Sequence, residues 1–248
     1  MQDPRTRFSA TVDAYERYRP SYPAGLVDWI LEESGVPPKG RVADVGCGTG
    51  ISARLFAERG LEVVGIDPNE EMLDRARQAG GARFLRGDAA ATGLETGAFD
   101  LVTSGQAFHW FPTEPTLAEF SRILKPGGSC AVFWNTRTST PFMRAYDGVL
   151  SSLSTEYGEI PKPRESARSI GASARVRNLV ERTFPHVQVL DREGLLGRAH
   201  SSSYVVHGVL DKPAFDDALT ALFHRHQVGG RVEFTYASLV LLFGLAPG

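Results

Sequence analysis

The chain has little of what marks several common classes of protein. Its 248 residues include two cysteines, and Cys47 and Cys130 form no disulfide pattern or thiol-rich metal pattern. Lysines and arginines (27) nearly balance aspartates and glutamates (29), and no run of five basic residues occurs. The charge pattern typical of a nucleic-acid-binding protein is therefore missing.

Long apolar runs are missing as well. No segment approaches the ~20 apolar residues of a membrane-spanning helix, and the polar start, MQDPRTR, lacks the apolar stretch of a signal peptide. A hydrophobic content of 42% and a charged content of 23% are ordinary for a globular chain, and the length fits one α/β domain with an insertion. We expect a soluble, cytoplasmic protein with no membrane or nucleic-acid partner.

A glycine-rich turn is the most informative feature that is present. The run VADV contains an acid, Asp44, and leads into three alternating glycines: Gly46, Gly48 and Gly50. A second apolar run ends in Asp67, nineteen residues after Gly48. Strand, glycine turn, helix, strand and acid, in this order, are typical of a βαβ unit that binds a nucleoside. The glycines let the backbone approach the ligand, and the second acid accepts hydrogen bonds from ribose hydroxyls.

The spacing of the turn separates two kinds of nucleoside. A dinucleotide fingerprint reads G-x-G-x-x-G, whereas this turn reads G-x-G-x-G. The carboxylate of Asp44 would repel a pyrophosphate and attract a sulfonium or an α-amino cation. The pattern favours a cationic nucleoside over a NAD-type ligand. The remaining alternative, a glycine turn without any ligand, is disfavoured by two correctly spaced acids.

Apolar periodicity predicts alternating strands and helices. Strands are expected at 42–45, 63–66, 82–86, 99–103 and 129–134, and their alternation with helices favours a parallel sheet covered on both faces. Before them, two helices are expected around 8–18 and 26–31, separated by Pro20 and Pro23.

The second half reads less regularly. Residues 139–184 predict a helix, a proline- and charge-rich loop over 156–170, and another helix around Val176, Leu179 and Val180. Late strands are expected at 187–190 and within 238–243, with a helix around 215–223 between them.

From about Phe8 to its end, the chain resembles the class I (Rossmann-like) S-adenosylmethionine-dependent methyltransferases, whose first motif has the pattern of Asp44–Gly50. Within them it is most similar to the small-molecule branch related to trans-aconitate methyltransferases, the methyltransferase type 11-like proteins. Three stretches are typical of that group or of the superfamily: Tyr15-x-x-Tyr18-Arg19-Pro20-x-Tyr22-Pro23, Gln106-Ala107-Phe108-His109-Trp110-Phe111 and Leu124-Lys125-Pro126-Gly127-Gly128.

The resemblance implies an α/β fold with a doubly wound sheet of seven strands, order 3-2-1-4-5-7-6, the last strand antiparallel. It implies one methyltransferase domain over 1–248. The parts would be an N-terminal helical lid (1–38), a cofactor-binding core (39–136), inserted lid helices (139–184), and C-terminal strands with a helix (185–248). S-adenosylmethionine, converted to S-adenosylhomocysteine, would lie across the carboxyl ends of the first strands.

The resemblance also implies which residues bind that cofactor. The candidates are Asp44, Gly46, Cys47, Gly48, Asp67, Pro68, Met72, Asp88, Ala89, Gln106 and Ala107.

Each part of the cofactor has its own candidates. The glycine turn would pack against the methionine moiety, with Asp44 near its amino group, and Asp67 would take the ribose hydroxyls. Pro68 or Met72 would lie against the adenine. Its exocyclic amine would donate to Asp88, with Ala89 alongside, and Gln106 and Ala107 would line the sulfonium side. For Asp88, a plain turn residue after Gly87 is the alternative.

Four residues are candidates on the acceptor side. His109 suits a general base, because imidazole titrates near pH 6.5, although a carboxylate acceptor needs no base. Trp110 either offers a π face to the sulfonium or belongs to the core. Tyr15 and Arg19 lie in the lid segment, and Arg19 is a candidate anchor for an anionic group. No metal is expected, since His224 and His226 do not share a helix face.

The expected function is transfer of the methyl group of S-adenosylmethionine to a small organic molecule, with O-methylation of a metabolite favoured. The expected assembly is a monomer or a homodimer. Two alternatives stay open. One is a macromolecule (RNA or protein) methyltransferase, which the missing basic patch disfavours. The other is an S-adenosylmethionine-binding protein with a different reaction or a regulatory role, which has the same cofactor motifs.

Overall fold

The computed structural model describes residues 17–159 and 163–246, so Tyr15 and most of the first expected helix lie outside the described residues. The chain divides into two compact units. The larger unit comprises residues 21–135, 161–184 and 238–248, and the smaller unit comprises 1–20, 136–160 and 185–237. The chain therefore passes several times from one unit to the other.

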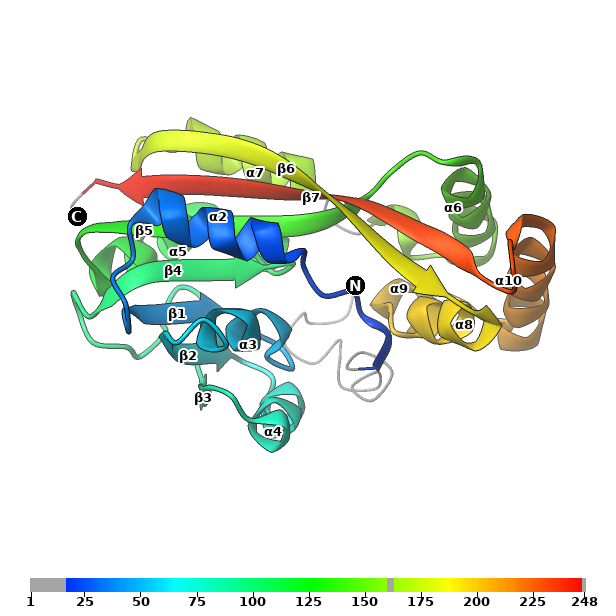
Figure 1. Cartoon of the computed structure of the whole chain (residues 1–248), viewed down its shortest axis with the longest axis horizontal. Coiled ribbons are helices and arrows are strands. Elements are labelled where there is room, and N and C mark those ends of the chain that lie inside the picture. The colour runs from blue at the N-terminus through cyan, green and yellow to red at the C-terminus, as the bar shows by residue number, and fades with distance from the viewer. Residues whose placement is uncertain (1–16, 160–162, 247–248) are drawn as a thin grey trace. The chain divides into compact units, whose positions relative to one another are not determined.

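Seven strands form the sheet: β1 (Arg41–Val45), β2 (Glu62–Asp67), β3 (Arg83–Arg86), β4 (Phe99–Gly105), β5 (Leu124–Arg137), β6 (Val176–Leu190) and β7 (Val232–Leu245). Their order is β3-β2-β1-β4-β5-β7-β6. Strands β1 to β5 pair in parallel, and β7 runs in the opposite direction (Figure 1). The predicted doubly wound sheet, its order and its antiparallel last strand are confirmed.

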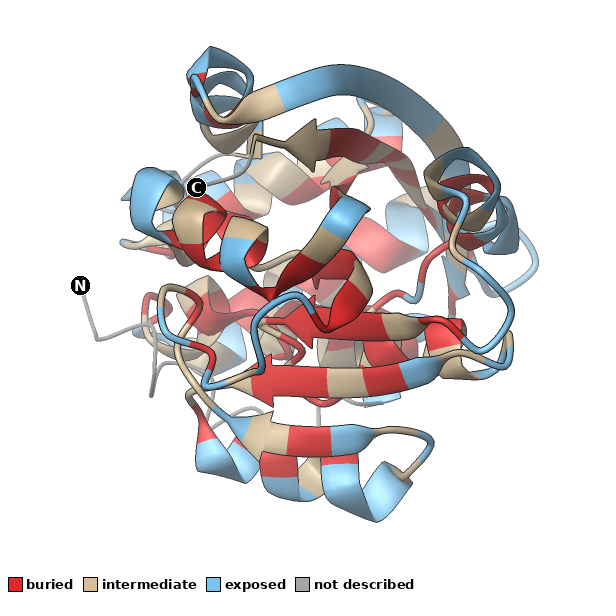
Figure 2. Ribbon diagram, turned by 90° about the vertical axis from the view of Figure 1, so that its left-hand side faces the viewer, coloured by how far each residue is buried: buried red, intermediate tan, exposed pale blue. Residues whose placement is uncertain are grey.

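The central strands are buried on both faces, which explains their nearly continuous apolar sequence (Figure 2). Val42 and its neighbour on β4, Leu101, belong to one apolar cluster. The next pair in register, Ala43 and Val102, belongs to another. Because successive side chains point to opposite faces of a strand, the two clusters lie on the two sides of the sheet.

Helices of the larger unit are α2 (Ala24–Ser34), α3 (Ile51–Ala57), α4 (Glu70–Ala79), α5 (Thr113–Ile123) and α7 (Pro163–Ala172). Helix α2 ends at Gly35 in the left-handed conformation. Its residues Leu26, Val27 and Ile30 are completely or almost completely buried in the first apolar cluster. Helix α2 thus packs into the core of the larger unit, and the helical lid expected over 1–38 stays a prediction.

The elements expected within residues 139–184 are found in part, and their lid role stays a prediction. Helix α6 (Pro141–Leu153) begins beside Thr140, whose side chain accepts from the amide of Met143. The expected loop over 156–170 contains a short 3-10 helix, η3 (Tyr157–Glu159), and most of α7, while the helix expected around 176–180 is part of strand β6. That helix prediction was wrong because three apolar residues at helical spacing, Val176, Leu179 and Val180, are too few to separate a helix from a strand.

The smaller unit has its own apolar cluster. Its helices are α6, α8 (Arg192–His200), α9 (Ser203–Val206) and α10 (Lys212–His226). Helix α10 and the late strands contain the segments predicted at 215–223, 187–190 and 238–243. The sequence did not predict α8 and α9. No helix in the described ranges combines the length and the apolarity needed to cross a bilayer.

Candidate functional site

The glycine turn after β1 has a backbone that side chains disfavour. Gly46, Gly48 and Gly50 have φ values of 75°, 53° and 81°, in the left-handed region that glycine enters without penalty. A Cβ added to Gly46 would lie 2.4 Å from the Cβ of Ala107, whereas one added to Gly48 meets no atom within 4 Å. Both the packing and the backbone conformation therefore require glycine at position 46. At position 48 only the conformation requires glycine, and the space beside Gly48 is open.

Asp67 at the end of β2 contacts this turn directly. Its Oδ2 accepts from the amide of Gly48 at 2.9 Å, and its Oδ1 accepts from the amide of Asn69 at 2.9 Å. Burial raises the pKa of Asp67, while these two amides oppose the shift. Because a carboxylate has about four acceptor positions, each oxygen retains capacity for a further donor. The acid is therefore held in place and can still accept two hydroxyls.

Asp44 lies beneath the turn and is completely buried. Its Oδ2 accepts from the hydroxyl of Ser52 at 2.6 Å, and its Oδ1 accepts from that of Thr103 at 2.8 Å. Burial raises its pKa to about 6, although both hydroxyls oppose the shift. The carboxylate joins β1, α3 and β4. A cation bound at the turn would reduce the cost of burying this charge.

Ser52 and Thr103 are site residues that sequence reasoning missed. The available signal was weak: each is a small hydroxyl residue within a mostly apolar helix or strand, Ile51–Ala57 and Phe99–Gly105. Both are buried.

The carboxyl end of β4 has an unusual backbone. Gln106 has φ of 56°, which is rare for a residue other than glycine and often marks a functional position. Its amide donates to the carbonyl of Phe133 at 2.9 Å, and its Nε2 donates to that of Asn135 at 3.3 Å. Ala107 packs against Gly46. Two residues expected on the sulfonium side therefore lie at the glycine turn or at the adjacent strand end.

His109 lies in the short 3-10 helix η2 (Phe108–Trp110) and faces an indole donor. Nε1 of Trp134 donates to Nδ1 of His109 at 3.3 Å. Since an indole N–H only donates, Nδ1 is the acceptor nitrogen and the neutral ring carries its proton on Nε2. Nδ1 is therefore engaged by Trp134 and is not the nitrogen that could act as a general base. Its ring centre lies 5.0 Å from that of Trp110.

The remaining cofactor candidates also lie in the larger unit. Asp88 accepts from the amide of Ala90 at 3.1 Å, as a turn aspartate does. Met72 and Ala89 are almost fully buried. Pro68 is half-buried, directly after Asp67. Cys47 is buried in the first apolar cluster, and burial raises the pKa of its thiol.

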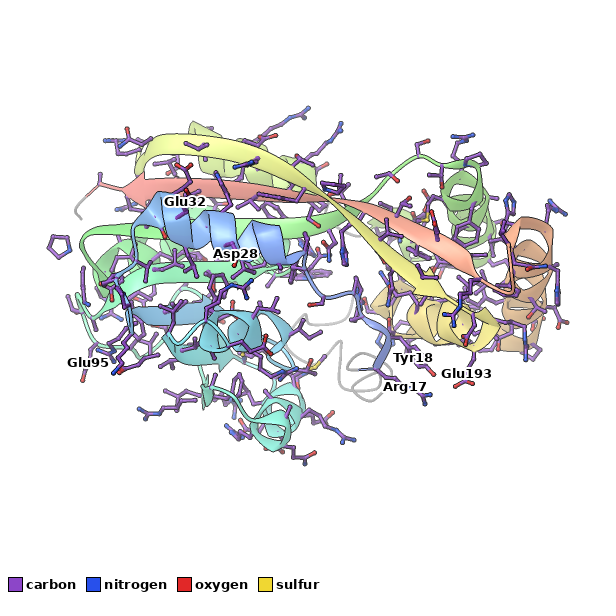
Figure 3. The ribbon with its side chains drawn as sticks, viewed as in Figure 1. Arg17, Tyr18, Asp28, Glu32, Glu95 and Glu193 are labelled. Atoms are coloured by element: carbon purple, nitrogen blue, oxygen red, sulfur yellow. The ribbon has the colours of Figure 1, made fainter. Side chains whose placement is uncertain are left out.

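The tyrosine-rich N-terminal signature divides between the two units. In the smaller unit, Tyr18 donates to Glu193 at 3.1 Å and Arg17 pairs with the same carboxylate at 3.3 Å (Figure 3). Arg19 donates to the carbonyl of Ser201 at 2.9 Å. In the larger unit, the Tyr22 ring lies 4.7 Å from that of Phe133 in an edge-on contact. Tyr22 is thus a core residue.

In the described part of the chain, no group of three or more histidine, cysteine, aspartate or glutamate side chains could hold a metal ion. His224 and His226 lie on α10 in the smaller unit.

Comparison with known proteins agrees with this geometry. Residues 43–132 match the methyltransferase domain family. An uncharacterized methyltransferase of Mycobacterium tuberculosis is 41% identical over 137 residues, which are 55% of this chain and 55% of that protein. The chain spans about half the length of the curated relatives it matches.

Two solved structures show the same fold. A protein from Anaeromyxobacter dehalogenans assigned as a type II methyltransferase has a TM-score of 0.65 at 22% identity, covering 92% of this chain and 98% of that one. A Haemonchus contortus phosphoethanolamine N-methyltransferase was solved with phosphomonomethylethanolamine and S-adenosylhomocysteine. It has a TM-score of 0.57 at 19% identity, and the match covers 99% of this chain and 59% of that one. The matched segment, residues 43–132, contains the glycine turn and both acids, and the strand order of the chain is that of a Rossmann-like methyltransferase fold.

Proposed function

We propose that the protein transfers a methyl group from S-adenosylmethionine to a small organic acceptor. The observation that carries this proposal is the hydrogen bond between the Gly48 amide and Asp67 at 2.9 Å. It joins the turn and the acid at one point, next to the open space at Gly48. A ribose and the chain attached to it need this combination of a fixed acceptor and an open backbone.

The two acids of the site support the choice of this cofactor. Asp67 has acceptor capacity for two ribose hydroxyls, and the buried charge of Asp44 supports a positively charged ligand above it. Gln106 and Ala107 would border the sulfonium. The adenine would lie against Pro68 or Met72 and donate to Asp88, beside Ala89.

S-Adenosylmethionine supplies a methyl group on a sulfonium, which is already an activated leaving group. The work left for the chain is to align the acceptor and to exclude water. His109, held by Trp134 through Nδ1, would line the acceptor side. Trp110 would offer its π face to the cation. This arrangement favours an acceptor that needs no base, such as a carboxylate.

The finer parts of the proposal come from the branch resemblance. They are O-methylation of a metabolite, a covering role for the N-terminal segment with Tyr15 and Arg19, and a cytoplasmic monomer or homodimer. Each stays a prediction.

Calorimetry with S-adenosylhomocysteine, S-adenosylmethionine and NAD tests the cofactor. We expect binding of the first two in the micromolar range, about 7–8 kcal/mol, and little or none of NAD. Asp67→Asn removes the charge behind two hydrogen bonds, each worth about 1.5–3 kcal/mol, and should weaken binding more than Asp88→Asn, the matched control. Tight binding of NAD with none of the sulfonium cofactor would contradict the proposal.

Mass spectrometry tests the transfer itself. The protein and S-adenosylmethionine would be incubated with a panel of small organic acids, alcohols and amines, and each acceptor examined for the gain of one methyl group. Cofactor binding without transfer to any acceptor of the panel, under conditions where a known methyltransferase is active, would favour the regulatory alternative.

A further inference from the structure

A cluster of arginines and tyrosines lies inside the smaller unit and has no part in the cofactor site. Its members come from the end of β5, from α6 and η3, from α8 and α9, and from the start of β7 (Figure 1). We call it the arginine–tyrosine cluster, and it consists of Arg137, Tyr146, Tyr157, Arg198, Tyr204 and Tyr236. All of these residues belong to one compact unit.

Arg137 connects three of the phenols. Its Nη1 donates to the hydroxyl of Tyr204 at 3.1 Å, and its Nη2 donates to the hydroxyl of Tyr157. The guanidinium carbon lies 5.6 Å from the ring centre of Tyr146. Arg137 pairs with Asp147 at 3.0 Å, and this carboxylate also accepts from Tyr157 at 2.8 Å.

Arg198 is a buried cation without a carboxylate. It is 4% exposed. Its Nε donates to the hydroxyl of Tyr236 at 3.1 Å, and its Nη1 donates to the hydroxyls of Ser202 and Ser201 at 3.0 and 3.4 Å. Within the described residues, none of the ion pairs involves Arg198. A buried charge compensated only by neutral groups is costly, so an anion nearby would be strongly favoured.

Tyr146 adds an unused polar atom to the cluster. Its side chain is completely buried, and its hydroxyl has no hydrogen-bond partner in the described part of the chain. A buried hydroxyl without a partner costs free energy unless a ligand or water satisfies it. The ring of Tyr146 packs on Phe234 at 4.9 Å, and the guanidinium carbon of Arg198 lies 5.4 Å from the same Phe234 ring.

The pKa of Tyr204 reflects the positive charge around its phenol. Burial by itself would raise the pKa of its phenol. Arg137, Arg198, a hydrogen bond with Ser202, and Arg19 together outweigh burial and lower the pKa to about 7. The interior of the cluster therefore favours negative charge, and Asp147 is the one carboxylate that pairs with Arg137 in the described residues.

We infer that the arginine–tyrosine cluster binds an oxyanion, a carboxylate or a phosphate. Two guanidinium groups provide planar donors that match either oxyanion, and the hydroxyl of Tyr146 provides a further donor.

Anion binding can be measured without the methyl-transfer reaction. The full chain would be titrated with inorganic phosphate and, separately, with succinate, against sodium chloride at equal ionic strength, by calorimetry and by thermal denaturation. Tyr146→Phe is the informative variant, because it removes a hydroxyl that bonds to nothing in the described structure. Its melting temperature without added anion should equal or exceed that of the wild type. Its affinity for the preferred anion should fall roughly fivefold or more.

Two further variants separate charge in the cluster from charge in general. Arg137→Lys keeps the positive charge but loses the planar fork, and should weaken binding by about tenfold. Arg144→Lys is the control, since Arg144 lies exposed on the same helix as Tyr146 and bonds only to Ser139. It should change the affinity by less than about twofold. Preference for succinate assigns a carboxylate, and preference for phosphate assigns a phosphate ester.

The results that would overturn the inference are distinct from failure of the proposed function. If S-adenosylhomocysteine binds but neither anion binds more tightly than chloride, the inference fails and the proposed function stands. Equal anion affinities of wild type and Tyr146→Phe also overturn it. If an anion binds through the cluster but S-adenosylhomocysteine does not bind, the proposed function fails and the oxyanion site remains.

Discussion

Gly46 and Gly48 share a left-handed backbone, but their surroundings differ. A methyl group at Gly46 would collide with Ala107 at 2.4 Å and with the ring of Phe111 at 2.8 Å, whereas the space at Gly48 is open. The same substitution at two positions of one turn should therefore separate packing from ligand binding.

We predict that Gly46→Ala destabilises the protein more than Gly48→Ala does. Both variants incur the left-handed cost of about 1–2 kcal/mol, and Gly46→Ala adds about 1–3 kcal/mol of overpacking. Gly48→Ala should instead weaken S-adenosylhomocysteine binding, because its methyl group would occupy the open face beside Asp67. Urea denaturation and calorimetry measure the two effects. Equal losses of stability would show that Ala107 and Phe111 move away at little cost.

Asp44 makes cofactor affinity depend on pH. Burial raises its pKa to about 6, so folding favours the neutral acid. The stabilisation from this group is present at low pH and is lost as the pH rises through about 6. Binding of a ligand that places an ammonium group near Asp44, as S-adenosylhomocysteine would, has the opposite dependence, because the carboxylate must be charged.

We therefore expect the affinity for S-adenosylhomocysteine to increase between about pH 5 and pH 7. Asp44→Asn keeps the hydrogen bonds with Ser52 and Thr103, since a hydroxyl can accept as well as donate. It should bind more weakly at pH 8 and with less dependence on pH. Calorimetry at several pH values would measure both proteins, and an unchanged pH dependence in the variant would exclude Asp44 as its source.

At the scale of elements, the two ends of the N-terminal segment contact different units. Tyr22 packs on Phe133, and the carbonyl of Ser21 accepts from Nδ2 of Asn135 at 3.0 Å. Both contacts lie within the larger unit, whereas Arg17, Tyr18 and Arg19 contact residues of the smaller unit. Its two ends should therefore have separable effects.

We predict that deleting residues 1–16 lowers turnover more than it lowers cofactor affinity. Deleting residues 1–23 should also lower stability, because the loss of a buried aromatic side chain costs about 3–5 kcal/mol. Thermal denaturation and calorimetry compare the two truncations. Full turnover of the shorter deletion would contradict a covering role for the first sixteen residues, and equal stabilities would contradict the core role of Tyr22.

At the scale of the whole molecule, the two candidate sites belong to different units. Every candidate cofactor residue lies in the larger unit, and the arginine–tyrosine cluster lies in the smaller one. Strands β5, β6 and β7 each contribute residues to both units.

We predict that the two ligands protect different amides from hydrogen exchange. S-Adenosylhomocysteine should slow exchange around Gly48 and Asn69, whose amides bond to Asp67, because binding suppresses local opening. Phosphate or succinate should slow exchange in α8 and α9. Mass-spectrometric exchange of the full chain would show the pattern. Protection by S-adenosylhomocysteine confined to α8 and α9 would mean that the cofactor site is misassigned.

Local patterns were sufficient for the glycine turn and for the acid that meets it. Gly48 and Asp67 follow the ends of two strands that pair in register, so their meeting follows from the order of neighbouring elements. The wider strand order was available through the family resemblance, and it is confirmed. The start of strand β6 was misread because Val176, Leu179 and Val180 stand at helical spacing, although the segment is a strand.

Contacts between distant residues depended on the tertiary structure. The hydroxyl of Thr103 reaches Asp44 across 59 positions, and the indole of Trp134 selects the acceptor nitrogen of His109 across 25. The arginine–tyrosine cluster gathers residues from 137 to 236, none of which forms a local motif. Strand and turn propensities act over a few residues, whereas the pKa of an acid, the tautomer of a ring and the charge of a buried site depend on which side chains the folded core brings together.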